Sequence, residues 1–157
     1  MKFKLHAGSV VDTLTKEELD AGLTRNTASF FQELARGRNP ARFDSTADVD
    51  GSGGITLPSV GDTKIGPDLG YAWALQRLTA AGLGDDDVLL VYRNSPTGPN
   101  FLGQVTATTP YKPGTKGVIL RGDERILCVG TSLTATGEIS VNGEAIEVAA
   151  SDLYKIL

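Results

Sequence analysis

Turn-forming residues recur about every eight to twelve residues between positions 43 and 150, and this spacing limits most strongly what the chain can fold into. Short apolar runs such as DVLLVYRN, FLGQVT and RILCVG separate the turns, and the chain holds 19 Gly and 7 Pro. Many short strands between regular turns are typical of an antiparallel sandwich or barrel. We therefore expect a mainly β protein whose body, residues 43–150, is an antiparallel β-sandwich of jelly-roll-like or immunoglobulin-like type.

Three of these turns predict β-hairpins inside the body. Residues 50–54, DGSGG, lie between Val49 and Ile55, and residues 121–124, RGDE, lie between two apolar runs. Asn142-Gly143 is the dipeptide that most strongly favours a two-residue hairpin turn. Residues 71–80 alternate in a way that fits a long strand better than a helix.

The longest segment with helical periodicity is 15–37, near the start of the chain. Thr15 is suited to the N-cap with Glu18 completing a capping box, and Gly37 is suited to end the helix. One side of this predicted helix carries Leu19, Leu23, Asn26, Phe30 and Leu34. Its intrinsic helix propensity is poor, so packing against a partner must stabilise it.

Two interpretations of this N-terminal arm, residues 1–42, remain open. The polar Asn26 can set the register of a coiled coil, or the helix can lie on its own sheet with Asn26 at the margin. Residues 2–6 are either a short strand or an extended tail before the turn at Gly8, and to be ordered they would have to pair with the main sheet or another subunit. Residues 36–45 are predicted to be a linker broken by Pro40. At the other end, residues 151–157 form a capped turn whose Leu153, Tyr154 and Leu157 are expected to dock on the body or on a neighbour.

The charge distribution argues against nucleic acid as a partner. The formal net charge is −4 and the isoelectric point is near 4.9. Such an acidic chain has no electrostatic footprint for a phosphate backbone. Arg36, Arg38 and Arg42 form a small basic cluster, which either contacts an acidic partner or is a solvated helix end. The sequence has no apolar run of 18 residues and no signal peptide, so we expect a protein made in the cytosol with no membrane partner.

No motif supports catalysis, a cofactor or a metal centre. Residues 48–55 match the start of an EF-hand calcium loop, but Ser59 stands where its bidentate Glu belongs and Pro58 prevents an exiting helix. His6 is the sole histidine, and Cys128 lies in an apolar run that predicts a buried, inert thiol. The carboxylates at 85–87 and 123–124 lie on predicted turns. We therefore expect a non-enzyme without catalytic, cofactor-binding or metal-binding residues.

Three stretches resemble a family of small virion structural proteins of tailed bacteriophages. They are VVDTLTKEEL, then GYAWALQRLTAAGL with VLLVYRNSPTGPNFLGQV, and finally GVILRGDERILCVGTSLTATGEISVNGEAIEVAASDLYKIL. The resemblance covers most of residues 10–157 and is most specific in YRNS, NFLG and TATGEISVNGEAIEV. It implies a structural component of the virion with a β-sandwich body, no cofactor and no catalytic residues.

From this resemblance we expect a capsid decoration protein that forms a homo-oligomer, with a trimer favoured, and docks on the major capsid protein or another virion protein. A head–tail connector or tail accessory protein would use the same parts. A carbohydrate-binding β-sandwich module is a third possibility, in which exposed aromatic residues stack on sugars. Its candidate residues are Tyr71, Tyr92, Phe101 and Tyr111, although their strand positions favour the core.

Overall fold

The computed structural model describes residues 2–3, 14–15, 39–114 and 117–157. The chain divides into two compact units, Met1–Asn39 and Pro40–Leu157. In the first unit, β1 (Lys2–Phe3) pairs antiparallel with β2 (Leu14–Thr15). The sequence-based expectation that this terminal strand needs the main sheet or another subunit was wrong, because a nearer segment supplies its partner. The predicted helix beyond Thr15, with Leu19, Leu23, Asn26, Phe30 and Leu34, lies outside the described residues.

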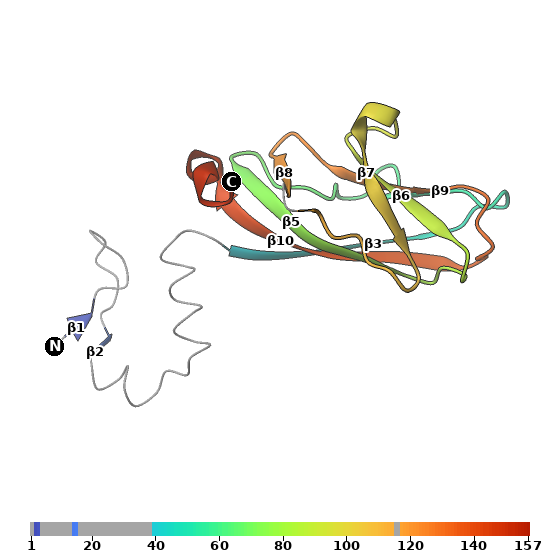
Figure 1. Ribbon diagram of the computed structural model, residues 1–157, viewed down its shortest axis with the longest axis horizontal. Coiled ribbons are helices and arrows are strands. Elements are labelled where there is room, and N and C mark those ends of the chain that lie inside the picture. The colour runs from blue at the N-terminus through green and yellow to red at the C-terminus, as the bar shows by residue number, and fades with distance from the viewer. Residues whose placement is uncertain (1, 4–13, 16–38, 115–116) are drawn as a thin grey trace. The chain divides into compact units, whose positions relative to one another are not determined.

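The described part of the second unit, which we call the body, is built from eight strands and two short 3-10 helices (Figure 1). The strands are β3 (Asn39–Asp48), β4 (Ile55–Leu57), β5 (Tyr71–Ala81), β6 (Val88–Arg93), β7 (Phe101–Thr106), β8 (Val118–Arg121), β9 (Ile126–Gly130) and β10 (Glu138–Ala149). The 3-10 helices are η1 (Gly98–Asn100) and η2 (Ala150–Lys155). The prediction of a mainly β body is thus confirmed.

The eight strands form two four-stranded sheets that pack as layers (Figure 1). One sheet has the order β3-β10-β5-β8, and the other has the order β4-β9-β6-β7. The first four strands therefore pair with the last four in reverse order: β3 with β10, β4 with β9, β5 with β8, and β6 with β7. A single long antiparallel ribbon folded over on itself produces this pattern.

Apolar side chains from the inner faces of both sheets form one core. Strand β6 places Leu89 and Val91 inward, and both are fully buried. In β5, Gln76 is an extra residue opposite the Glu144–Ala145 step of β10, so that Leu75 and Leu78 both face the core. The core includes Leu57, Leu75, Leu78, Leu89, Val91, Val105, Leu120, Ile126, Cys128, Ile139 and Val141.

Two of the three predicted hairpins are connections between the sheets. Residues 50–54 join β3 to β4, and residues 121–124 join β8 to β9, but each pair of strands belongs to different sheets. The turn signals were located correctly, but the hairpin prediction was wrong. A tight turn can return a chain to its own sheet or pass it to the facing one, and local turn chemistry is the same in both cases.

Asn142-Gly143 forms no turn, because β10 runs through it without interruption. Asn142 pairs with Thr79 and Gly143 pairs with Leu78 on β5. A Cβ atom at Gly143 would overlap the ring of Phe43, which comes from the neighbouring strand β3. Glycine is present here to make room for an aromatic ring, a requirement that resembles a turn signal in the sequence alone.

The predicted linker at 36–45 was also wrong for residues 39–45, which begin β3. This strand lies at the edge of its sheet. An edge strand tolerates Pro40 because half of its backbone N–H groups need no partner. The Phe43 ring stacks on Trp73 with ring centroids 5.5 Å apart and planes 15° from parallel. The Trp73 indole N–H donates a hydrogen bond of 2.7 Å to the Glu147 carboxylate on β10.

Asp87 connects the loop between β5 and β6 to the loop between β9 and β10 through hydrogen bonds. Its carboxylate accepts hydrogen bonds from the backbone N–H of Gly84, Thr134 and Ala135, at 2.7–2.9 Å, and from the Thr134 hydroxyl at 3.0 Å. The residue is only 4% exposed. The bond from the Thr134 N–H is the largest of the effects that lower the pKa of this carboxyl to about 2. The loop after β5 is thereby joined to the loop before β10.

Candidate binding surfaces

Apolar side chains gather at the end of the body where the chain finishes. Leu69 is 82% exposed, Tyr71 43% and Leu157 83%. Leu153 lines one hollow together with Leu69 and Tyr71, and a second hollow together with Leu157 and Ile119. We call Leu69, Tyr71, Leu153 and Leu157 the C-terminal patch.

The C-terminal patch is held in place by the last 3-10 helix, η2. This helix contacts both β10 and β5, and the Ala150 N–H donates a 2.8 Å hydrogen bond to the Gly70 carbonyl. The patch contains two of the C-terminal residues that the sequence indicated as interface candidates, Leu153 and Leu157, and the third, Tyr154, is 70% exposed on the same 3-10 helix as Leu153. Leu69 and Tyr71 join them from about 80 residues earlier in the chain. The sequence did not indicate these two residues as partners of the C-terminus, because only the paired strands bring them there.

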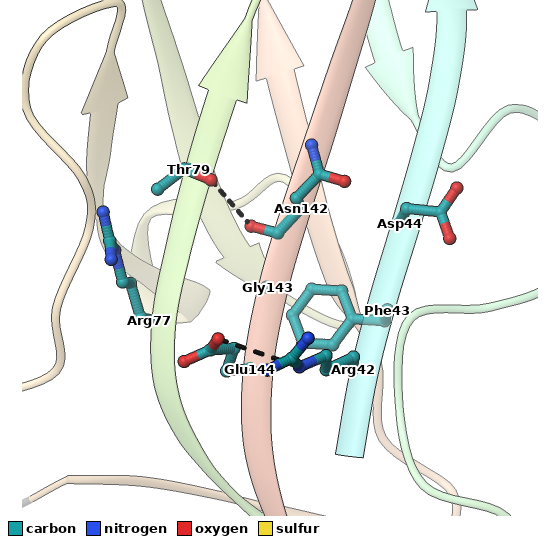
Figure 2. A pocket seen from close by; sticks show the side chains of 8 residues that line it. All are labelled: Arg42, Phe43, Asp44, Arg77, Thr79, Asn142, Gly143 and Glu144. Atoms are coloured by element: carbon teal, nitrogen blue, oxygen red, sulfur yellow. Dashed lines mark hydrogen bonds and ion pairs between the residues drawn. The ribbon is translucent and has the colours of Figure 1, made fainter. Parts of the chain in front are cut away.

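A second candidate surface is polar and lies across β3, β10 and β5 (Figure 2). Its pocket has a volume of about 420 Å³ and is lined by Arg42, Phe43, Asp44, Arg77, Thr79, Asn142, Gly143 and Glu144. The Arg42 Nε atom lies 3.9 Å from a Glu144 carboxylate oxygen, and both side chains are largely exposed. The Arg77 side chain forms no ion pair with any described residue.

The polar pocket combines hydrogen-bond donors and acceptors at zero formal charge. Arg42 and Arg77 are balanced by Asp44 and Glu144. Thr79 donates its hydroxyl to the Asn142 backbone carbonyl at 3.3 Å, and no described residue forms a hydrogen bond with the Asn142 side-chain amide. A hydroxyl group both donates and accepts hydrogen bonds, so a neutral, hydroxyl-rich ligand matches this lining better than an ion does.

The four aromatic residues considered for sugar stacking do not form one platform. Tyr71 belongs to the C-terminal patch, and Phe101 contacts Tyr92 edge to face on the second sheet, with ring centroids 5.7 Å apart. The Tyr111 ring lies where a Cβ of Gly103 would be. The sequence favoured the core for most of these aromatic residues, but Tyr71 and Phe101 are 43% and 47% exposed. Phe101 lies opposite Tyr92 on the outer side of its sheet, and Tyr71 is the first residue of β5, at the end of the sandwich.

Three of the carboxylates weighed as metal or catalytic groups, Asp50, Asp87 and Glu124, accept hydrogen bonds from backbone N–H groups. Asp50 accepts hydrogen bonds from the Ser52 hydroxyl, the Ser52 N–H and the Gly54 N–H, and these bonds lower the pKa of its carboxyl. Strands, not helices, precede and follow this loop. Glu124 accepts the Arg121 N–H and lies 3.8 Å from the Arg93 guanidinium. Within the described ranges, no three His, Cys, Asp or Glu residues cluster as metal ligands would.

Cys128 is the buried thiol that the sequence predicted. Its side chain faces the core and burial raises the pKa of the thiol to about 12. A thiolate is therefore scarce at neutral pH, and the residue acts as a small apolar side chain. None of the described helices is long and apolar enough to cross a membrane.

Comparisons with known proteins do not assign the chain to a family. No family model matches it, and neither does any curated protein. Among solved structures, it is similar to the NLP core of Drosophila, whose structure was reported to give insight into pentamer formation and histone binding. That likeness covers 68% of this chain and 95% of the other at 13% identity, with a TM-score of 0.28. It is too distant to bear on what this chain binds.

Proposed function

We propose that this protein is a non-catalytic structural component of a tailed-bacteriophage virion, of the capsid decoration type. The proposal begins from the resemblance of residues 10–157 to small virion proteins. The strand orders β3-β10-β5-β8 and β4-β9-β6-β7 support it, because they are those of a jelly roll, an architecture that recurs in viral capsid domains. The division of the chain at residue 39 also suits an N-terminal arm that joins copies into a homo-oligomer.

The observation that carries the docking part of the proposal is the C-terminal patch. Leu69 and Leu157 are each more than 80% exposed and lie around Leu153. Exposed apolar clusters of this kind mark sites of protein–protein contact. The patch is rimmed by Arg121, Asp123 and Glu124, which gives it the apolar centre and polar rim of an interface. In this proposal the patch contacts the major capsid protein.

Replacing Leu69 and Leu157 with Lys should abolish incorporation into particles. Two charges would have to be buried without partners at the contact, so we expect at least a tenfold loss of occupancy, which corresponds to about 1.4 kcal/mol. Purified particles analysed by quantitative mass spectrometry and by immunogold electron microscopy provide the measurement. Val60→Lys is the matched control, because Val60 is fully exposed on a loop outside the patch. Absence of the wild-type protein from particles would refute the virion assignment, and equal occupancy of all variants would refute the docking surface.

The polar pocket favours a second candidate function, a carbohydrate-binding module. Its neutral set of donors and acceptors suits a saccharide, although the aromatic ring in its lining, Phe43, is only partly exposed and already stacks on Trp73. If this function is correct, the full chain binds a defined set of glycans on an array. Arg77→Ala should then weaken binding by about tenfold, because a charged hydrogen bond contributes about 1.5–3 kcal/mol. Uniform background on the array would reject this candidate.

A further inference from the structure

An arginine occupies an inward position at the end of β6. Leu89 and Val91 of this strand are fully buried between the sheets, and Arg93 is the next residue on the same side. Its partner on β9 is Ile126, which is also fully buried. A charged side chain at such a position loses part of its hydration. This loss is costly unless hydrogen bonds and a counter-charge replace the water.

The described residues only partly satisfy Arg93. Its Nη1 atom lies 3.8 Å from a Glu124 carboxylate oxygen, which is too far for a hydrogen bond. Its Nε atom is buried and has no hydrogen-bond partner among the described residues. The side chain is nevertheless 33% exposed, so it also borders the surface. Such a group in a folded protein calls for an explanation, and an acceptor from a bound partner is one.

Arg93 lies in the wall of one of the two hollows of the C-terminal patch. This hollow has a volume of about 410 Å³, which is within the range of ligand pockets. It is lined by Arg93, Ile119, Arg121, Glu124, Leu153 and Leu157. Two arginines and one carboxylate give this lining one excess positive charge. The Arg121 side chain is exposed and forms no ion pair with any described residue.

We propose that this hollow binds an acidic side chain, Asp or Glu, that stands next to an apolar residue in a segment of the partner protein. The carboxylate accepts hydrogen bonds from the guanidinium groups of Arg93 and Arg121, whose planar forks match its geometry. The neighbouring apolar side chain contacts Leu153 and Leu157. The inference rests on the docking role proposed for the C-terminal patch, and it specifies the chemistry of the segment that docks there.

Charge selects this occupant. Glu124 cannot neutralise both arginines, and one of its oxygens already accepts the Arg121 backbone N–H at 2.8 Å. A basic side chain from a partner would meet two positive charges and one negative charge. A wholly apolar side chain would cover the Arg93 guanidinium without supplying an acceptor, which is unfavourable. An acidic side chain balances the hollow, and the apolar walls favour an apolar neighbour beside it.

Two short peptides test the inference on the full chain. They are the acetylated, amidated tripeptide leucine-glutamate-leucine and its glutamine counterpart, which has nearly the same shape and no charge. We expect the glutamate peptide to bind with a Kd lower by about fivefold or more, because hydrogen bonds between charged groups are the stronger ones. NMR titration of the ¹⁵N-labelled chain at pH 7 measures both values. The largest shifts should occur at the Arg93 Nε–H and at the amides of Ile119 and Leu153.

Substitution of the exposed arginine checks that the hollow makes the distinction. Arg121→Gln should reduce the preference for the glutamate peptide to less than about twofold, because the excess positive charge is lost. Arg125→Gln is the matched control, since Arg125 is also exposed but lines a different hollow. Its preference should equal that of the wild type. Equal Kd values for the two peptides in the wild type would overturn the proposal, and so would a preference that Arg121→Gln leaves unchanged.

Two further measurements separate this inference from its alternatives. Acetate that binds as tightly as the glutamate peptide would show a site for small anions only, and would overturn the docking of a segment. If Leu69→Lys with Leu157→Lys lowers particle occupancy while the wild type binds both peptides equally, the patch docks a segment of other chemistry and only this inference fails. If the peptides are distinguished but occupancy is unchanged, the docking role on particles fails instead.

Discussion

Gly143→Ala should destabilise the body by about 1–3 kcal/mol, the usual cost of forcing an extra group into a packed site. The new methyl group would overlap the Phe43 ring, which stacks on Trp73. To relieve the overlap, the ring must leave Trp73 or β3 must move away from β10. Urea denaturation of the full chain measures the loss, and hydrogen exchange should show faster exchange in the β10 amides that face β3.

The matched control is Gly137→Ala, because a Cβ at Gly137 meets no atom within 4 Å. This substitution should change the free energy of unfolding by less than about 0.5 kcal/mol. A double-mutant cycle identifies the cause: in a Phe43→Ala background, Gly143→Ala should cost much less than it does in the wild type. Equal costs in both backgrounds would show that the ring is not the obstacle.

Asp87→Asn should lower the melting temperature by several degrees at neutral pH. The carboxylate accepts four hydrogen bonds from Gly84, Thr134 and Ala135, and an amide offers only one oxygen to the same donors. Backbone N–H groups at the junction of the two loops would lose their acceptor. Asp86→Asn, a charge-matched change at the next position, should have little effect because Asp86 forms no such bonds.

The effect of Asp87 should depend on pH in a defined direction. The hydrogen bonds that the Asp87 carboxylate accepts lower the pKa of its carboxyl from the ordinary value of 3.8 to about 2 in the folded protein. A lowered pKa stabilises the folded state fully above about pH 4, and this contribution falls as the pH drops towards 2. The difference in melting temperature between wild type and Asp87→Asn should therefore be constant from pH 7 to 5 and shrink below pH 4. A difference that grows on acidification would contradict this assignment.

The positions of most body strands could be predicted from the sequence. The alternation in residues 71–80 and the apolar runs at 88–93 and 126–130 correspond to β5, β6 and β9. These segments are recognisable because successive side chains of a strand point to opposite faces of the sheet, so that buried and exposed positions follow a repeating pattern. Strand pairing was not predictable in the same way. The pairings of β4 with β9 and of β5 with β8 and β10 join residues 43–78 positions apart, and the turns between strands do not encode them.

Gly143 shows why a strong local signal can mislead. The Asn-Gly pair favours a hairpin only when the chain is free to reverse, and here both residues are held in the ladder between β10 and β5. The candidate surfaces were only partly predictable for a related reason. Leu153, Tyr154 and Leu157 stand out because an apolar chain end needs cover. Leu69 does not stand out, because it lies in the turn before β5 and only the folding of the whole body brings it beside Leu153.

The pairing of β3 with β10 has a consequence for how the protein is made. Roughly 90 residues separate the end of β3 from the start of β10, and β3, at the edge of its sheet, has no other neighbouring strand. At about 5–20 residues per second, a ribosome needs on the order of ten seconds to synthesise the missing partner. During that interval β3 lacks the strand with which it pairs in the folded body, so its residues are open to pairing with another nascent chain. A proline and charged side chains on an unpaired strand discourage intermolecular pairing. Strand β3 carries such residues at Pro40, Arg42 and Asp44.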